Sequence, residues 1–423
     1  MDKYVIHGGT ALKGSVAISG SKNASLPLMV ASLLTEEDVT LRNVPNLLDV
    51  LVLAKLLEKL GKDIDLKHDV MHIRQKNVKK IEAPYELVKK MRASVIVLGP
   101  LLARYKHCRV SLPGGCAFGP RPIDLHIKGL EALGAKIAID HGYIDAKAKS
   151  LTGKRIVLAG KFGSSVLATD NVMMAATLAR GTTVIESAAM EPECVDLANM
   201  LISMGADITG AGTPVITVKG MKELHGTEYE VIPDRIETGT FLTAALATRG
   251  SIALTNCNPE HCMSAIDTLI SIGATVKMGP REIEIKAKRT LKPFAIETMP
   301  YPMFPTDLQA QFITLGSTIN GISSLTERVY PDRFMHVPEL SRMGARIAVE
   351  GSTAIIHGGG KLIGCDVQAS DLRAGAGLVV AGLAAGNTTT VHRIYHIDRG
   401  YEGFEAKLTS LGAHIKREKD TIL

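Results

Sequence analysis

Leu60-Gly61-Lys62-Asp63-Ile64 is the first of six related stretches that decide the fold of this chain. In each stretch a helical pattern of apolar residues ends at a glycine, and a β-branched residue three positions later begins a strand pattern. Glycine suits the left-handed conformation that closes a helix, and β-branched residues favour strands. The other five stretches are Leu133-Gly134-Ala135-Lys136-Ile137, Met204-Gly205-Ala206-Asp207-Ile208, Ile272-Gly273-Ala274-Thr275-Val276, Met343-Gly344-Ala345-Arg346-Ile347 and Leu411-Gly412-Ala413-His414-Ile415. Because the glycines lie 68 to 73 residues apart, the sequence predicts six copies of one structural unit.

Each unit is also predicted to contain a second helix that is apolar enough to lie in a core. These helices are expected to begin near Lys22, Arg92, Asp170, Arg235, Asp307 and Asp371. Strand patterns such as Thr182–Glu186 and Ser251–Thr255 lie between the helices. With two helices and three or four strands in each unit, the fold class is mixed α/β.

Six units in 423 residues most simply make two domains of three units, and a closed ring of six is the alternative. We expect one domain to consist of residues 1–21 plus 232–423 and so to contain both termini. Residues 22–231 are expected to form the second domain, which carries the segment around Cys116. The first strands, within residues 4–19, are expected to complete the last unit. The cleft between the two domains is the expected active site.

The composition argues against several classes of protein. A net charge of +6, only 4% aromatic residues and no Trp give little basis for nucleic-acid binding. The longest apolar stretch, Leu372–Ala385, is broken by glycines and contains an arginine, which argues against a membrane span. The N-terminus lacks the apolar core of a signal peptide, and the six cysteines have no paired spacing. We therefore expect a cytoplasmic protein with reduced thiols, no metal site and no cofactor-binding motif.

Charged residues gather at the expected helix starts, where backbone N–H groups favour anions. The examples are Lys22, Arg92, Arg235, Asp307, Arg373, and the pairs Asp332-Arg333 and Asp398-Arg399. Several cations facing one cleft would bind phosphate and carboxylate groups together. The structural alternative is that each arginine pairs with its adjacent aspartate or caps a preceding helix.

The stretch Leu112–Pro122 contains three glycines and three prolines and is expected to form a loop. One interpretation is a structural loop with an incidental Cys116. The other is a lid carrying a reactive thiol, because Arg121 and Lys22 would lower the pKa of a nearby thiol. The sequence leaves both interpretations open.

Several longer stretches of the chain are distinctive when taken together and in order. They are Gly20-Ser21-Lys22-Asn23, Gly114-Gly115-Cys116, Arg121-Pro122-Ile123-Asp124-Leu125-His126, Pro233-Asp234-Arg235-Ile236-Glu237-Thr238-Gly239, Phe304-Pro305-Thr306-Asp307-Leu308-Gln309-Ala310-Gln311, Arg333-Phe334-Met335-His336-Val337-Pro338-Glu339-Leu340 and Tyr395-His396-Ile397-Asp398-Arg399-Gly400-Tyr401-Glu402. In these stretches the chain resembles the enolpyruvyl transferase family, and within it the members that act on UDP-N-acetylglucosamine. The resemblance runs essentially from end to end. It implies two inside-out α/β domains, each of three repeated units.

The resemblance also implies the reaction. The 3′-hydroxyl of UDP-N-acetylglucosamine attacks C2 of phosphoenolpyruvate, giving a tetrahedral intermediate from which phosphate leaves, in the first committed step of peptidoglycan synthesis. Asp307 is then the expected base and Cys116 the expected acid, while Lys22, Arg121 and Arg399 hold phosphate. No metal or cofactor is required. Some relatives have Asp at the position of Cys116. Because this chain has Cys116, whose thiol the epoxide fosfomycin alkylates, covalent inactivation is expected.

Further substrate contacts follow from the resemblance alone. Asn23 is expected to contact the sugar, and the backbone of 121–125 (Arg121, Pro122, Ile123, Asp124 and Leu125) is expected to hold the uridine. Ser165 and Val166 are expected to bind the diphosphate. Other contacts are expected from Arg92, Val329, Arg333, Asp371 and Arg373. Asp371 beside Arg373, and Glu237 beside Arg235, have structural ion pairing as the alternative. Ile96 replaces an aromatic residue found in many relatives, and Lys161 lies further from Ser165 than the lysine of some relatives.

Three rival functions remain. The first rival is an enolpyruvyl transferase that acts on shikimate 3-phosphate, but the Cys116 loop and the uridine segment argue against it. The second is a catalytically silent UDP-sugar sensor, but the presence of Lys22, Cys116, Asp307 and Arg399 argues against it. The third rival, an enzyme like the RNA-terminal cyclases, would need a nucleotidylation histidine motif that we do not find.

Overall fold

The computed structural model describes residues 1–76, 81–89, 91–112, 123–161 and 163–420. Within them the chain divides into two compact units. Unit 1 consists of Met1–Ser19 and Pro233–Leu423, and unit 2 of Gly20–Ile232. These bounds differ by one or two residues from the ranges expected from the sequence. The expected cleft between the domains stays a prediction.

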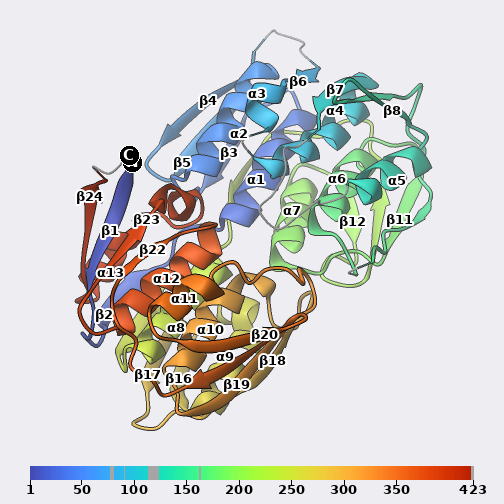
Figure 1. Ribbon diagram of the computed structural model, residues 1–423. Helices are drawn as coiled ribbons and strands as arrows, with labels where there is room; N and C mark the ends of the chain where they lie inside the picture. Colours follow the sequence, from blue (N-terminus) through green and yellow to red (C-terminus); the bar gives the residue numbers. More distant parts are fainter. Residues whose placement is uncertain (77–80, 90, 113–122, 162, 421–423) are drawn as a thin grey trace. The chain divides into compact units, whose positions relative to one another are not determined.

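The described strands of unit 1 form three four-stranded sheets (Figure 1). In sheet order they are β22 (Asp366–Gln368), β23 (Thr388–His392), β1 (Asp2–His7) and β24 (His414–Lys419); β16 (Ala274–Gly279), β17 (Glu282–Ala287), β15 (Ser251–Thr255) and β2 (Lys13–Ala17); and β18 (Ala295–Thr298), β19 (Gly321–Glu327), β21 (Thr353–Gly358) and β20 (Arg346–Glu350).

Unit 2 has three described sheets of the same size. They are β10 (Arg155–Val157), β11 (Thr182–Glu186), β13 (Val215–Lys219) and β12 (Asp207–Thr209); β14 (Thr227–Glu230), β3 (Val39–Arg42), β5 (Val70–Gln75) and β4 (Lys62–Lys67); and β6 (Glu82–Ala83), β7 (His107–Ser111), β9 (Tyr143–Lys147) and β8 (Lys136–Asp140).

All six described sheets share one topology: the two strands at one end of each sheet are parallel, and the other two neighbouring pairs are antiparallel. This regularity confirms the six repeated units. The strands expected at Thr182–Glu186 and Ser251–Thr255 are β11 and β15.

Each described repeat has two kinds of helix. The helices that end at the repeat glycine are α2 (Leu48–Lys59), α5 (Asp124–Ala132), α7 (Pro192–Ser203), α9 (Met263–Ile272), α11 (Val337–Arg342) and α13 (Phe404–Ser410). The others are α1 (Lys22–Ala31), α4 (Leu98–Tyr105), α6 (Val166–Ala176), α8 (Arg235–Ala247), α10 (Gln309–Ser317) and α12 (Leu372–Ala384). Short helical turns are η1 (Ser32–Leu34), α3 (Tyr85–Val88), η2 (Arg92–Val97), η3 (Pro259–Cys262), η4 (Thr306–Leu308) and η5 (Ile394–Arg399).

The six repeat glycines all have a positive φ, between +88° and +118°. A side chain would strain the backbone in this conformation, which explains why glycine recurs at the position between helix and strand. The local interpretation of these six stretches is therefore confirmed.

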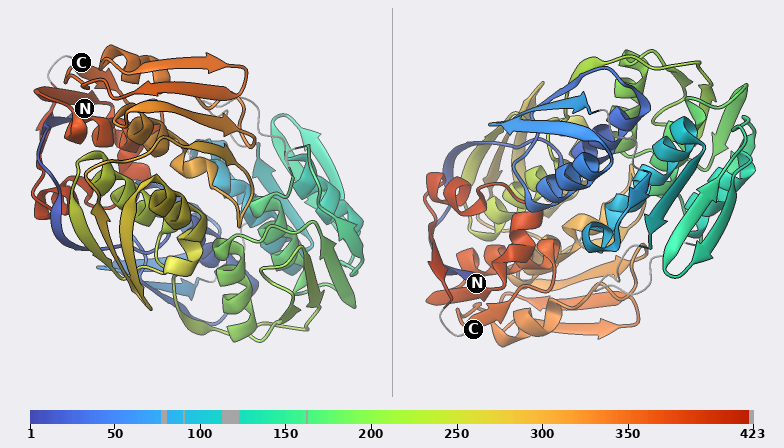
Figure 2. Two further views of the ribbon diagram at one scale, coloured as in Figure 1. Left: turned by 90° about the horizontal axis from the view of Figure 1, so that it is seen from below. Right: turned by 90° about the horizontal axis from the view of Figure 1, so that it is seen from above.

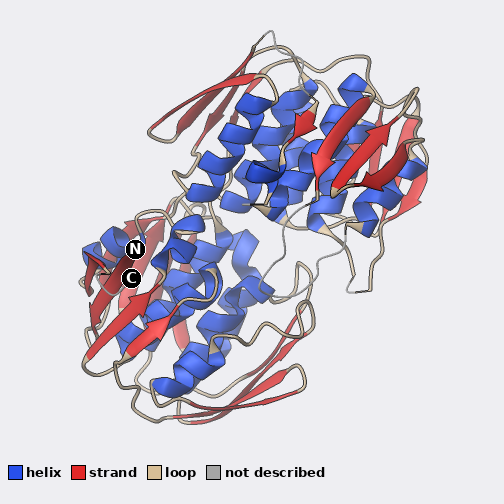
Figure 3. Ribbon diagram, turned by 45° about the horizontal axis from the view of Figure 1, so that its top comes forward, coloured by secondary structure: helices blue, strands red, loops and turns tan. Residues whose placement is uncertain are grey.

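In each unit the apolar helices lie inside and the sheets outside (Figure 3). In unit 1 nearly every residue of α8, α10 and α12 is buried. Strands such as β17 bury only alternate side chains, as expected for a sheet with one face on a core. Two separate apolar cores result, one in each unit. This arrangement confirms the inside-out α/β fold.

The two N-terminal strands join different sheets. β1 pairs with β23 and β24, which completes the sheet of the last repeat and places Asp2 opposite Lys419 in unit 1 (Figure 2). β2 instead pairs in parallel with β15. The expectation that residues 4–19 complete the last unit is therefore right for β1 and wrong for β2, because a strand's partner depends on distant residues.

No helix in the described part of the chain is long and apolar enough to cross a membrane.

Candidate active site

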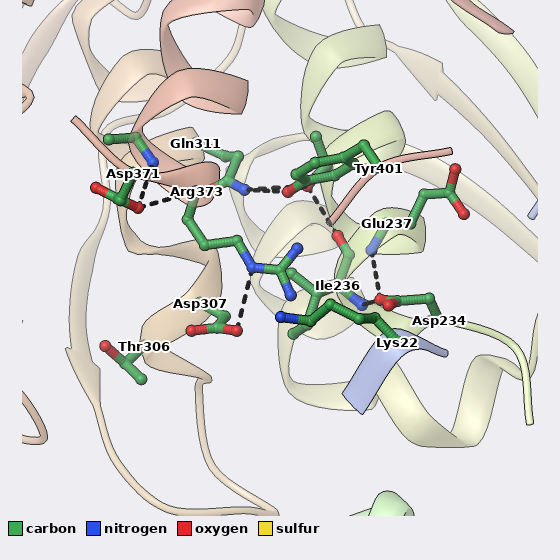
Figure 4. Close-up of polar contacts among 12 residues, drawn as sticks. Lys22, Asp234, Ile236, Glu237, Thr306, Asp307, Gln311, Asp371, Arg373 and Tyr401 are labelled. Carbon is green, nitrogen blue, oxygen red and sulfur yellow. Dashed lines mark hydrogen bonds and ion pairs between the residues drawn. The ribbon is translucent and has the colours of Figure 1, made fainter. Parts of the chain in front are cut away.

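The side chain of Asp307 lies between two buried arginines, Arg333 and Arg373, in unit 1. Figure 4 shows its contact with Arg373. The guanidinium Nη1 of Arg333 donates to Asp307 Oδ1 at 2.8 Å, and Nε of Arg373 donates to Oδ2 at 3.1 Å. Arg333 and Arg373 are only 5% and 1% exposed, whereas the Asp307 side chain is 28% exposed. Two positive charges at this distance favour the ionised carboxylate, which is the form that accepts a proton.

Arg373 is held by the start of α12. Asp371 caps this helix, since its Oδ1 accepts hydrogen bonds from the backbone N–H groups of Arg373 and Ala374 at 2.9 and 3.1 Å. Burial lowers the pKa of Arg373, but the neighbouring Tyr401, Asp307 and Asp234 outweigh burial and raise it overall. The guanidinium therefore stays charged.

The terminal nitrogens of Arg373 suit an anionic ligand. Among the described residues, neither Nη1 nor Nη2 has a hydrogen-bond partner, although both are buried. A buried charged donor without an acceptor is costly, and a carboxylate or phosphate oxygen would satisfy it.

A buried cluster of polar side chains lies beside Arg373. Nε2 of Gln311 donates to Thr240 Oγ1 at 3.0 Å and to Tyr401 Oη at 3.1 Å, and the two hydroxyls lie 3.0 Å apart. The Arg373 guanidinium carbon lies 5.2 Å from the centroid of the Tyr401 ring. Burial raises the pKa of Tyr401, so this hydroxyl stays protonated. Tyr401 and Gln311 belong to the stretches that carry the family resemblance, but the resemblance predicts no role for either of them.

In unit 2, two helix starts carry residues expected to bind anions. Lys22 is the first residue of α1, after the capping residue Ser21, and its Nζ lies 3.4 Å from Asp49 Oδ2. Asn23 follows in the same first turn. Ser165 caps α6 through Ala168 N, and Val166 begins the helix. Both helices present N–H groups and a partial positive charge at these ends.

Arg92 and the described part of the expected uridine-binding segment, residues 123–125, also lie at helix starts in unit 2. Arg92 begins η2, Asp124 begins α5, and Ile123 and Leu125 flank Asp124. The buried ring of His126 is next to this segment: burial, with a smaller effect from Arg92, lowers its pKa to about 3. The neutral ring lies 2.9 Å from Nδ2 of Asn171, whose Oδ1 accepts from Gly99 N at 2.6 Å. Asn171 thus joins α4, α5 and α6.

The structure brings together the expected residues Asp307, Arg333, Asp371 and Arg373 within unit 1. Val329 lies two residues after β19, and Arg399 ends η5. Cys116, Arg121 and Pro122 lie outside the described residues, so their roles stay predictions.

Several expectations about charged residues were wrong. α6 begins at Val166 rather than near Asp170, because Ser165 supplies the cap. Asp398 binds Arg417 at 2.6 Å, and Arg333 binds Asp307, so the idea of pairing between adjacent residues fails for both. Lys407 Nζ is 2.6 Å from Glu237 Oε1, which gives Glu237 a structural ion pair, with a partner other than the expected Arg235.

Ile96, the residue that departs from many relatives, is fully buried and belongs to the core of unit 2. The described residues contain no group of three or more His, Cys, Asp or Glu side chains arranged to hold a metal ion. The five described cysteines are free thiols.

Comparison with known proteins places this geometry in context. The profile of the family described as EPSP synthase (3-phosphoshikimate 1-carboxyvinyltransferase) matches residues 6–408. The chain is 50% identical over 417 residues to UDP-N-acetylglucosamine 1-carboxyvinyltransferase of Desulfosudis oleivorans, covering 99% of both chains. It is 51% identical over 422 residues to UDP-N-acetylglucosamine 1-carboxyvinyltransferase 2 of Carboxydothermus hydrogenoformans, covering 99% of this chain and 100% of the other.

Solved structures have the same fold. The enolpyruvyl transferase NikO from Streptomyces tendae superposes with a TM-score of 0.88 at 25% identity, covering 99% of both chains. EPSP synthase from Acinetobacter baumannii superposes with a TM-score of 0.75 at 20% identity, covering 99% of this chain and 100% of the other.

Proposed function

Since the chain belongs to the EPSP synthase family of enolpyruvyl transferases, we propose that it transfers the enolpyruvyl group of phosphoenolpyruvate to the 3′-hydroxyl of UDP-N-acetylglucosamine. The observation that carries the choice of acceptor is the 50% identity, over 99% of both chains, to a relative with that activity in its name. The product feeds peptidoglycan synthesis, and loss of the enzyme is therefore expected to affect cell shape and division.

The reaction needs a base at the acceptor hydroxyl and a proton donor at C3 of phosphoenolpyruvate. Asp307 takes the hydroxyl proton as the sugar oxygen forms its bond to C2. C3 gains a proton from Cys116, which gives the tetrahedral intermediate. The C2–O bond to phosphate then breaks, and the Cys116 thiolate takes a proton back from C3, which restores the double bond. This sequence of steps balances without an oxidant, a metal or a cofactor.

Cations stabilise the charge that moves through these steps. Lys22, Arg121 and Arg399 bind the phosphate that leaves, and Arg373 offers two unsatisfied terminal nitrogens to an anionic group. Ser165 and Val166 offer the N-terminus of α6 to the diphosphate of the acceptor.

Release of phosphate from phosphoenolpyruvate tests the proposal. We expect release with UDP-N-acetylglucosamine and none with shikimate 3-phosphate. Asp307→Asn should lower kcat about 100-fold or more, because a positioned base contributes about that factor. Asp332→Asn, an exposed carboxylate beside Arg333, is the matched control and should retain activity. Release with shikimate 3-phosphate would overturn the acceptor, and binding of the UDP-sugar without release would indicate a silent sensor.

Inactivation by fosfomycin is a separate prediction. The Cys116 thiolate should open the epoxide, forming a C–S bond while the ring oxygen takes a proton. Burial raises the pKa of Cys108 to about 12 and that of Cys257 to about 11, so these thiols should not compete. Mass spectrometry should find one adduct, on the peptide containing Cys116, in step with loss of activity. Cys116→Asp should stay active and unlabelled; full activity of the labelled wild type would contradict the prediction.

A further inference from the structure

Glu327 is a fully buried carboxylate outside the set of site residues expected from the sequence. It ends β19 and accepts four hydrogen bonds. Its Oε1 accepts from Thr298 Oγ1 at 2.6 Å and from the backbone N–H groups of Val329 and Tyr330 at 2.8 and 2.9 Å. Its Oε2 accepts from Thr306 Oγ1 at 2.8 Å. A buried carboxylate is costly unless it is satisfied in this way, so its presence needs an explanation.

One of these partners, Thr306, leads to the candidate base. Thr306 precedes Asp307 in η4, and the two side chains lie side by side (Figure 4). Nη1 of Arg333 donates both to Thr306 Oγ1 at 2.9 Å and to Asp307 Oδ1 at 2.8 Å. Glu327, Thr306, Arg333 and Asp307 therefore form one continuous chain of hydrogen bonds.

Two further contacts of Glu327 fix the loop that follows β19. The N–H groups of Val329 and Tyr330 fix the start of this loop on Oε1 of Glu327. Arg333, near the end of the same loop, is tied to Thr306. One carboxylate thus holds the loop that carries Val329 and Arg333 against the turn that carries Asp307.

The charge of Glu327 also sets the direction of the hydrogen bond from Thr306. Because the carboxylate only accepts, the Thr306 hydroxyl must donate to it, which leaves its lone pairs for Arg333. An amide nitrogen in the same place would donate instead. Thr306 Oγ1 would then face two donors, and its own proton would lose its acceptor.

We propose that Glu327 is a positioning residue for this reaction: it acts through Thr306 and Arg333 to orient the Asp307 carboxylate toward the acceptor hydroxyl. It contacts neither substrate. The inference rests on the proposed function, because it concerns the residue that takes the proton of the acceptor.

Steady-state kinetics of four variants test the inference. Thr306→Val keeps the shape of the side chain but removes the hydroxyl, and should lower kcat about tenfold, the effect of losing a hydrogen bond to a charged group. Thr306→Ser keeps the hydroxyl and should stay within about twofold of wild type. Glu327→Gln should lower kcat about tenfold and raise KM for UDP-N-acetylglucosamine, because the loop with Val329 also loosens. KM for phosphoenolpyruvate should stay within about twofold in all of them.

The fourth variant is a matched control from the end of the neighbouring strand. Glu297→Gln removes an exposed carboxylate of β18 that pairs with Arg328 at 3.2 Å, and kcat should not change. Melting curves establish that each variant is folded at the assay temperature. If Glu327→Gln is unfolded at the assay temperature, the comparison of Thr306→Val with Thr306→Ser decides the outcome.

The outcomes separate the two proposals. A folded Thr306→Val enzyme with wild-type kcat, or equal losses in Thr306→Val and Thr306→Ser, would overturn the role of Glu327 while the wild type still releases phosphate. A wild type that releases no phosphate with UDP-N-acetylglucosamine would overturn the proposed function and this inference with it. Loss of kcat in Thr306→Val, recovered in Thr306→Ser, supports the inference.

Discussion

At the scale of single residues, carboxylates in the described part of the chain differ in whether neighbouring groups compensate their charge. Asp307 and Glu327 are surrounded by cations and hydrogen-bond donors. Asp170 in α6 is fully buried and has no cation among the groups that shift its pKa. Burial, with smaller effects from Glu191 and Glu193, raises the pKa of Asp170 to about 7. This residue therefore costs stability whenever it is ionised.

Asp170→Asn should stabilise the protein in a pH-dependent way. The carboxyl of the unfolded chain titrates near its ordinary value of 3.8, and that of the folded chain near 7. The wild-type contribution is therefore most favourable below the unfolded value and is lost as pH rises through the folded value. The gain in unfolding free energy from Asp170→Asn should be larger at pH 8 than at pH 5 by at least about 1 kcal/mol.

Denaturant unfolding at the two pH values measures this difference. Asp207→Asn, an exposed aspartate of β12 in the same unit, is the control and should change stability by less than about 0.5 kcal/mol at either pH. A gain from Asp170→Asn that is the same at pH 5 and pH 8 would refute the assignment of a titrating buried acid.

At the scale of elements, local chemistry was predictable and long-range pairing was not. The six glycines with positive φ follow from the sequence because a helix end is a local event. α1 and α8 begin at Lys22 and Arg235, as expected. The expected start of α6 near Asp170 is wrong, because Ser165 caps the helix and α6 begins at Val166.

The candidate site divides in the same way. Asp307, Arg333 and Arg373 were found through the family resemblance, and their contacts confirm that they meet. The contacts of Glu327 and Tyr401 with the candidate site could not be predicted, because their partners, such as Thr298 and Thr240, lie 29 and 161 residues away. No periodic pattern in the sequence reports contacts of this kind.

At the scale of the whole molecule, the chain passes between the units at Ser19–Gly20 and Ile232–Pro233. Next to each crossing, a buried carboxylate holds the last residue before the crossing to the unit that this residue belongs to. Glu237 Oε2 accepts from Ser19 N at 2.8 Å, and Asp196 Oδ2 accepts from Ile232 N at 3.3 Å. The two apolar cores share no residue. Each unit therefore has the contacts expected of an independent folding domain.

Matched core substitutions should consequently act on one unit at a time. Phe312 packs edge-on against Phe304 in the core of unit 1, and Leu102 lies in the core of unit 2. Phe312→Ala should cost about 3–5 kcal/mol and Leu102→Ala about 2–5 kcal/mol, each lowering a different calorimetric transition. Because the proposed function requires both Asp307 of unit 1 and Lys22 of unit 2, activity should disappear at the lower transition in both variants. A single transition shifted alike by both substitutions would instead mean that the two units unfold as one.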